Sequence, residues 1–367
     1  MKIQNLSIAL LTLVIFLASC ASPAEQPPRS LPAVTETSVP TQTPAPTETQ
    51  PVINSLSPFE AIQKMQRGVN MGNTLEAPRE GEWGFTITQE HFQQIRAAGF
   101  DSVRIPTRWS AHALTEDPYT IEPTFFARLD EVIGWALEQD LMVVLNIHHY
   151  EEMATEPAAH EKRFLSLWQQ IAEHYKDYPP TLIFELMNEP NSALTPRLWN
   201  DFIQKGVAVI RESNPTRNII LGGTFWNAYD QLRYVNFPPG DGHLIATFHY
   251  YLPFEFTHQG AEWAGPEAQT WLGTTWNGTD EEKAEIKKHF TLVAAWAKQN
   301  NIPVYLGEFG AYSTADMDSR ARWTSYVREQ AEARGFAWAY WEFGAGFGVY
   351  DRDTRQWRDA LLKALIP

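Results

Sequence analysis

Residues 181–190, TLIFELMNEP, begin like a buried strand and end on an amide, a carboxylate and a proline. A largely apolar run reaches Met187 and is followed at once by Asn188 and Glu189. Burying an ionised carboxylate is costly unless the group is paired, neutralised or used. The reason for Glu189 must therefore lie in what the rest of the chain places near this strand end.

Short apolar runs of the same kind recur along the chain. They lie at 67–71, 102–106, 141–147, 181–187, 218–222, 244–248, 302–307 and 336–341. Between most of them, apolar residues follow a helical period, as in 124–138 and also in 161–175, 197–212, 281–298, 319–333 and 356–364. Strands that alternate with helices indicate a parallel sheet. Eight of them in about 310 residues predict an α/β fold of the (β/α)8 TIM-barrel type.

A doubly wound open sheet is the alternative fold. That fold commonly carries a glycine-rich phosphate loop after its first strand. Here the first strand is followed only by GVNMGN, residues 68–73. We therefore expect the barrel.

The N-terminal region has the features of an exported protein. Lys2 and an apolar stretch from Leu6 to Ala18 predict a signal peptide over 1–19 that is too short to span a bilayer. LASC, residues 17–20, resembles the lipobox of bacterial lipoproteins, which implies lipidation at Cys20; a free thiol in a signal cut elsewhere is the alternative. Residues 20–55 are rich in Pro and Thr and predict a disordered linker. A single globular domain, predicted over 56–367, follows the linker.

Composition narrows the classes of partner. The net charge of −15 argues against nucleic acid, which needs clustered Lys and Arg. The 14 tryptophans fit either a large core or flat platforms under sugar rings.

Polar and aromatic residues gather at the C-terminal ends of the predicted strands, where barrel enzymes place their active sites. They are Arg104, Asn146, His148, His149, Asn188, Glu189, His249, Tyr251, Glu308, Trp341 and Glu342. Two carboxyl groups on separate strands are what glycoside hydrolysis needs, one protonated and one ionised. A nearby Arg keeps one ionised, and burial keeps the other neutral, so that the two pKa values differ.

This set of residues resembles glycoside hydrolase family 5, the cellulase family A, over nearly all of 56–367. The resemblance rests on Asn188-Glu189-Pro190 after the fourth strand and on Glu308 in GEFG after the seventh. It implies that Glu189 is the general acid/base and Glu308 the nucleophile. It also implies supporting roles for five residues: Arg104 orients the nucleophile, Tyr251 hydrogen-bonds it, Asn188 contacts the sugar 2-hydroxyl, and His148 and His249 match the family's histidines.

Two further stretches resemble bacterial endoglucanases of this family that also cleave β-mannan. They are NMGNTLEAPREGEWG, residues 70–84, and HYYLPFEFTHQGAEW, residues 249–263. The resemblance implies that Asn73, Glu76, His149, His258, Trp263 and Trp341 bind substrate. Solvated loop charges are the alternative for Glu76 and His258, core packing is the alternative for Trp263, and one of the two adjacent histidines can be a packed residue.

We therefore expect a retaining, endo-acting hydrolase of β-1,4-glucan, with β-mannan as a possible second substrate. Mannanase or xyloglucanase activity within the same family, a metal-dependent barrel hydrolase, and a non-catalytic glycan-binding lipoprotein are the alternatives. We expect no cofactor and no metal, since His148 and His149 are adjacent in a strand and should point to opposite faces. The expected partners are a polysaccharide and, through Cys20 alone, a membrane, with the protein a monomer facing the cell exterior. The preferred polymer and endo or exo action stay open.

Overall fold

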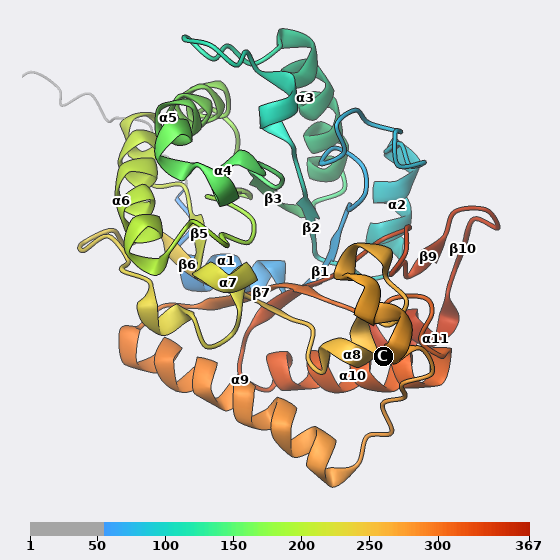
Figure 1. The fold of residues 1–367 in the computed structure, drawn as a ribbon. Coiled ribbons are helices and arrows are strands. Elements are labelled where there is room, and N and C mark those ends of the chain that lie inside the picture. The colour runs from blue at the N-terminus through green and yellow to red at the C-terminus, as the bar shows by residue number, and fades with distance from the viewer. Residues whose placement is uncertain (1–54) are drawn as a thin grey trace, which may run out of the picture. The chain divides into compact units, whose positions relative to one another are not determined.

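Eight parallel strands close into a barrel in this computed structural model, which describes residues 55–367 (Figure 1). The strands are β1 (Arg67–Asn70), β2 (Ser102–Ile105), β3 (Met142–Asn146), β4 (Leu182–Glu185), β5 (Ile219–Gly222), β6 (Leu244–Tyr250), β7 (Val304–Phe309) and β8 (Ala337–Tyr340). Val69 pairs with Val103 of β2 on one side and with Tyr340 of β8 on the other, so the sheet has no free edge. The predicted (β/α)8 barrel is confirmed, and the open sheet is excluded.

Each predicted apolar run overlaps one of these strands, but two strands extend farther than predicted. β6 continues to Tyr250 and β7 to Phe309. His249 and Glu308 therefore belong to the strands themselves and share their rigid backbone pairing, rather than standing in the loops beyond them.

Helices fill most of the connections around the barrel (Figure 1). They are α1 (Pro58–Met65), α2 (Gln89–Ala97), α3 (Pro123–Leu137), α4 (Glu152–Thr155), α5 (Pro157–His174), α6 (Pro196–Ser213), α7 (Thr224–Asn227), α8 (Phe254–Thr257), α9 (Asp280–Asn300), α10 (Met317–Glu332) and α11 (Asp359–Leu365). Four 3-10 segments add η1 (Trp109–His112), η2 (Leu232–Tyr234), η3 (Glu262–Ala264) and η4 (Pro266–Trp271).

The C-terminal helix begins later than predicted. Gln356 and Trp357, placed in a helix by their pattern, instead form β10 (Gln356–Trp357), which pairs with β9 (Tyr350–Asp351). Helix α11 starts only at Asp359. The half-buried Trp357 packs against the core from this hairpin and not from a helix face, a difference that the apolar period alone could not reveal.

Local sequence fixes several helix ends. Ser57 and Glu60 form a capping box at the start of α1, and Thr279 and Glu282 form another at the start of α9. Each box satisfies backbone N–H groups that the first helical turn leaves unpaired. Asn301 ends α9 in the left-handed conformation, with φ of 52°.

The apolar core has two parts. The larger lies between the strands and the surrounding helices. The smaller fills the barrel interior and consists of Met142, Val144, Ile183, Ile220, Ile245, Tyr305, Ala337 and Ala339, closed off by Ala61, Ile62 and Met65 of α1. We call this the plugged end of the barrel, and we call the end where the strands reach their C-termini the open end.

The expected signal peptide, the lipidation site Cys20 and the linker up to residue 54 lie outside the described residues. Within residues 55–367, no helix has both the length and the apolar character needed to cross a membrane.

Candidate active site

A buried arginine organises the open end of the barrel. Arg104 has no exposed surface, and its Nε and Nη2 donate to the carboxylate of Glu185 at 2.6 and 3.1 Å. Its Nη1 donates to Glu308 at 2.7 Å and to Asn70 Oδ1 at 2.9 Å, and its Nη2 also donates to Asn188 Oδ1 at 2.7 Å. Burial opposes the charge, but the two carboxylates overcome it and raise the pKa of Arg104. A fixed cation therefore lies beneath the site at any working pH.

Glu308 reaches the open end through an irregularity in β7. Phe248 pairs with Leu306, whereas the next residue of β6, His249, pairs with Glu308, so Gly307 is one residue extra on its strand. Such a bulge re-aims the side chain that follows it. A Cβ at Gly307 would come within 3.0 Å of His249 Nε2, so this position requires glycine.

The environment of Glu308 favours its ionised form relative to its neighbour Glu189. Arg104 contacts it at 2.7 Å, and the Tyr251 hydroxyl donates to its other oxygen at 2.9 Å. Burial raises the pKa of Glu308, while His249, Arg104 and the Tyr251 hydroxyl all oppose that rise. Since Glu189 receives no such direct cation contact, Glu308 is the first of the two to ionise.

Glu189 follows β4 in the left-handed region, with φ of 44°. This conformation is uncommon outside glycine and is often found where function demands it. The side chain is 23% exposed, and its Oε1 lies 2.7 Å from Nδ1 of His249. Burial raises the pKa of Glu189 to about 8, with Arg104 opposing and Glu185 adding to the rise. Glu189 can therefore hold a proton at neutral pH.

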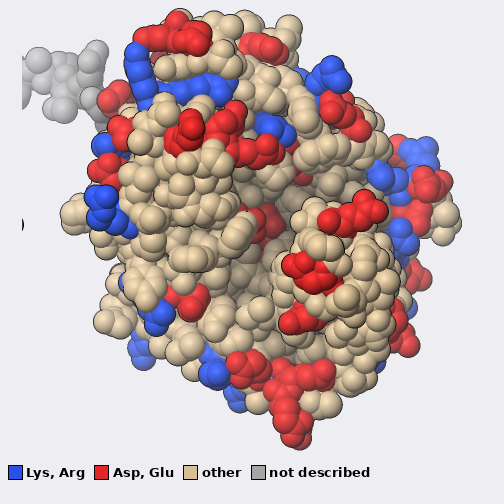
Figure 2. Space-filling model, in the orientation of Figure 1, with Lys and Arg blue, Asp and Glu red and all other residues tan. Residues whose placement is uncertain are grey.

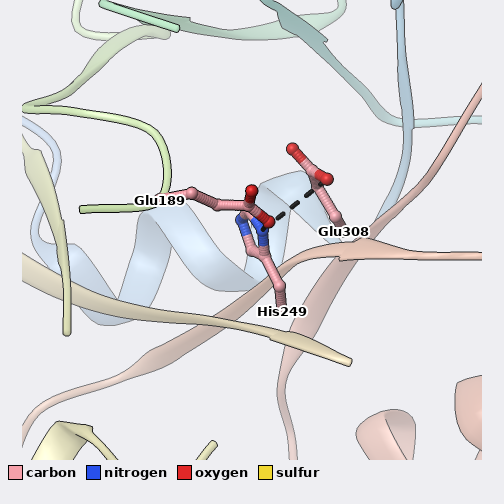
Figure 3. Close-up of side chains that lie close together, drawn as sticks. All are labelled: Glu189, His249 and Glu308. Carbon is pink, nitrogen blue, oxygen red and sulfur yellow. Dashed lines mark hydrogen bonds and ion pairs between the residues drawn. The ribbon is translucent and has the colours of Figure 1, made fainter. Parts of the chain in front are cut away.

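His249 lies between the two carboxyl groups (Figure 3). Its Nδ1 is 2.7 Å from Glu189 and 3.6 Å from Glu308. Burial lowers the pKa of His249 to about 4, so the ring is neutral at pH 7. One atom from each of the three residues lies within 4.8 Å of the others, close enough for a metal ion, but the guanidinium bound to Glu308 opposes a cation here.

The expectation that His148 and His149 point to opposite faces is wrong. Their ring centroids are 4.8 Å apart, because β3 ends at Asn146 and the strand alternation stops before them. His148 stacks on Trp341 with centroids 5.5 Å apart and rings 5° from parallel. The half-buried His149 lies edge to face with exposed Trp83 at 5.9 Å. Four rings thus run in sequence from Trp341 outward.

Glu76 is buried and is not a solvated loop charge. It accepts from the backbone N–H groups of Asn73 and Thr74, and burial raises its pKa to about 7. Glu342, one of the polar residues at the predicted strand ends, is also fully buried, and burial with the charge of Glu76 raises its pKa to about 8. The side chain of Asn73 also reaches Glu342. A pair of buried carboxyl groups thus lies beside Trp341.

The remaining predicted residues lie on the β6–α9 connection. His258 is 8% exposed and stacks on Phe254 with centroids 4.0 Å apart, so it too is no solvated charge. Trp263 is 64% exposed and lies edge to face with Tyr312 at 4.9 Å, which excludes core packing. Its open indole face is free to meet a ligand.

Sequence reasoning missed Glu185 and Asn70, and it placed Asn146 at a strand end without giving it a role. Glu185 pairs with Arg104, Asn146 donates to Glu185 at 3.1 Å, and Asn70 donates to the Gly307 carbonyl at 3.0 Å. A signal for Glu185 existed: it is the lone charge in an apolar strand, two residues from the inward-facing Ile183, and so faces the barrel interior.

The face that carries these residues is hollowed, with acidic side chains at the bottom of the hollow (Figure 2). An eight-stranded barrel that holds a protonated and an ionised carboxyl group at the C-terminal ends of β4 and β7 has the arrangement of the barrel glycoside hydrolases.

Comparison with known proteins gives the family. Residues 62–346 match the cellulase family, glycosyl hydrolase family 5. Endoglucanase H of Acetivibrio thermocellus is 39% identical over 319 residues, which cover 85% of this chain and 34% of that protein. The chain thus spans about a third of that relative's length.

Two solved structures match this chain over nearly their whole length. A hyperthermophilic endo-β-1,4-glucanase in complex with substrate is 47% identical, with a TM-score of 0.83, covering 85% of this chain and 99% of that one. Cel5A of Thermotoga maritima in complex with mannotriose is 48% identical, with a TM-score of 0.83, covering 84% and 100%. The chain belongs to glycosyl hydrolase family 5.

Proposed function

We propose that the protein is an endo-β-1,4-glucanase that hydrolyses its substrate with retention of anomeric configuration. The observation that carries the proposal is the short gap between the two carboxyl groups. One oxygen of Glu189 and one of Glu308 lie within 4.8 Å of each other. Retaining glycosidases hold their carboxyl groups about 5–5.5 Å apart, whereas inverting enzymes need about 6.5–9.5 Å to admit water.

The chemistry follows from the two environments. Glu308, ionised beside Arg104, attacks the anomeric carbon, while Glu189 donates its proton to the departing glycosidic oxygen. The product is a glycosyl-enzyme bonded through Glu308. Glu189, now ionised, takes a proton from water, the water oxygen attacks the same carbon, and Glu308 leaves. Two inversions give net retention.

The choice of β-1,4-glucan rests on the relatives, which are endoglucanases. β-Mannan is a second proposed substrate, because the Thermotoga maritima relative holds mannotriose. Since such polymers stay outside cells, the substrate also favours the exported location expected from residues 1–20.

Reducing-sugar release from soluble β-1,4-glucan and from β-mannan by the full chain tests the activity. Glu308→Gln should abolish release, because the neutral amide cannot attack carbon. Glu212→Gln, an exposed glutamate on α6, is the matched control and should leave release unchanged. Activity that survives Glu308→Gln would show that the nucleophile is wrong. Proton NMR should show the β-anomer first, and an initial α-anomer would exclude retention. Full activity in excess chelator is expected.

Glu189→Gln separates the acid from the nucleophile. Turnover of the polymer should fall about 10²–10⁴-fold, because the leaving sugar needs a proton. kcat/KM for 2,4-dinitrophenyl β-cellobioside should fall far less, because that leaving group departs without one. In the unsubstituted protein, kcat/KM for the polymer should decline as pH rises through about 8, where Glu189 loses its proton. An equal loss on both substrates would contradict the acid assignment.

A further inference from the structure

The turn after β5 holds three successive residues in a rare backbone conformation. Phe225, Trp226 and Asn227 have φ of 52°, 56° and 54°, all in the left-handed region. The segment labelled α7 is therefore a left-handed turn and not a regular helix. Phe225 and Trp226 are 56% and 54% exposed, whereas Asn227 is fully buried. Runs of such residues persist only where the surrounding structure imposes them, and they gather at functional sites.

Backbone contacts connect this turn to the segment after Glu189 and to the strand that carries His249. The N–H of Trp226 donates to the carbonyl of Pro190, the residue after Glu189, at 3.3 Å. Ala228, directly after the turn, forms a parallel bridge with His249. The turn therefore lies against the segment that carries Glu189 and against the strand that carries His249.

The side chain of Asn227 points at the ring of His249. Its Nδ2 lies 3.4 Å from Nε2, at the side of the ring away from Glu189. Gly222 makes room, since a Cβ there would stand 2.2 Å from Asn227 Oδ1. Among the described residues, that Oδ1 has no hydrogen-bond partner. The contact with His249 is thus the polar interaction that the buried amide makes.

This contact decides where the single proton of the neutral ring resides. When Nδ2 of Asn227 donates to Nε2, that nitrogen is an acceptor, and the ring proton is on Nδ1. Nδ1–H then donates to Glu189 Oε1 across 2.7 Å. A hydrogen bond given to a carboxylate favours its ionised form.

We propose that Asn227 is a positioning residue: through the tautomer of His249 it favours ionised Glu189, the form that takes a proton from water when the glycosyl-enzyme is hydrolysed. The proposal rests on the retaining mechanism above. It adds a residue outside the set that the family resemblance implies.

Other charged and titratable groups face Glu189 and His249. They are Arg104, Glu185, Glu308, Tyr251 and His148. Arg104 already neutralises Glu185 and contacts Glu308, and neither bond involves Asn227. Removing the amide therefore leaves this background in place.

Asn227→Gly is the decisive variant, because glycine accepts φ of 54° without strain and lacks the amide. With 2,4-dinitrophenyl β-cellobioside, whose turnover is limited by the second step, kcat should fall about tenfold while kcat/KM changes little. The acidic limb of kcat for this substrate should move up by roughly one pH unit, because Glu189 holds its proton more tightly. The alkaline limb of kcat/KM for soluble β-1,4-glucan, whose cleavage needs that proton, should move up by the same amount.

Thr224→Val is the matched control, since Thr224 is buried in the same turn and its Oγ1 has no hydrogen-bond partner among residues 55–367. It should leave both limbs in place. Limbs unmoved or moved down in Asn227→Gly, with the unsubstituted protein active, would overturn the proposal and leave the proposed function standing. An inactive unsubstituted protein would instead contradict the function.

A second measurement needs no activity. Long-range ¹H–¹⁵N spectra of histidine-labelled protein, with His249 identified by its loss in His249→Asn, report which nitrogen is protonated. The Nδ1–H form is expected in the unsubstituted protein and a mixture in Asn227→Gly. An Nε2–H ring in the unsubstituted protein would overturn the proposal.

Discussion

The two ends of the barrel interior are built from the same strands, but one end is apolar and the other is charged. Along β4, Ile183 faces the apolar cluster at the plugged end, and two residues later Glu185 faces the charged network at the open end. Side chains two apart on a strand share a face, so one strand supplies both layers. The cluster at the plugged end contains no charged residue and one hydroxyl group, that of Tyr305, whereas the open end contains charges that depend on one another.

The difference lies in how each end tolerates a loss. An apolar layer that loses a methyl group keeps most of its contacts. A buried ion network that loses one member leaves its partners charged, buried and unpaired. Substitutions at the open end should therefore cost stability and activity together, and substitutions at the plugged end should cost a little stability alone.

The largest effect should come from Arg104→Ala. It leaves Glu185 and Glu308 buried without their cation, which should lower the free energy of unfolding by about 3–5 kcal/mol. Initial rates should fall at least 10²-fold, since the nucleophile loses the charge that keeps it ionised.

Urea denaturation and polymer hydrolysis measure both losses. Arg128→Ala is the control, because Arg128 also pairs with carboxylates, at 2.8 Å to Glu80, but lies near the surface. It should cost no more than about 1 kcal/mol. Similar losses in the two variants would mean that burial of the network matters little.

A smaller effect should appear in the pH dependence of stability. Burial raises the pKa of Glu342 to about 8, from 4.5 for an ordinary carboxyl group. Protonated Glu342 makes its full contribution to the free energy of unfolding below pH 4.5. That contribution is lost as pH rises through 8, by up to a few kcal/mol. The melting temperature should fall from pH 5 to pH 9 and fall less in Glu342→Gln, which carries no charge to bury.

Burial also raises the pKa of Glu76, to about 7, so part of the fall in melting temperature with pH should remain in Glu342→Gln. Glu212→Gln should reproduce the slope of the unsubstituted protein, since Glu212 is exposed. Parallel curves for Glu342→Gln and the unsubstituted protein would show that Glu342 does not contribute.

The smallest effect should come from Ile220→Val at the plugged end. The loss of one buried methylene should cost about 0.5–1.5 kcal/mol. kcat and KM should not change, because no charged residue moves. A change in kcat larger than about twofold would show that the two ends of the barrel are coupled through β5.

Much of this contrast was predictable from the sequence. The eight apolar runs gave the strands because buried parallel strands are continuously apolar. The residues at the strand ends were found from the barrel rule together with the family motifs. Helix α2 was missed because QEHFQQIRA contains few apolar residues, of which only Phe92 and Ile95 are buried.

Tertiary contacts decided the rest. His148 and His149 escaped the strand alternation because β3 ends before them. Asn227 gave no signal, since its value depends on a left-handed turn whose sequence, TFWN, lacks the glycine that usually marks one. Glu76 and Glu342 are far apart in sequence, and their mutual burial follows only from closing β1 against β8.

The extra residue in β7 can be gained or lost without changing the face of the strand on which the nucleophile lies. Tyr305 faces the barrel interior, so by simple alternation the side chain at 308 would face away from it. Gly307 shifts the count by one and turns Glu308 inward. Deleting the codon of Gly307 would place the glutamate two residues after Tyr305, where regular alternation also turns a side chain inward, so the carboxylate should keep its direction. The gain or loss of this single codon therefore changes the local pairing of β6 with β7 without taking the nucleophile out of the cleft.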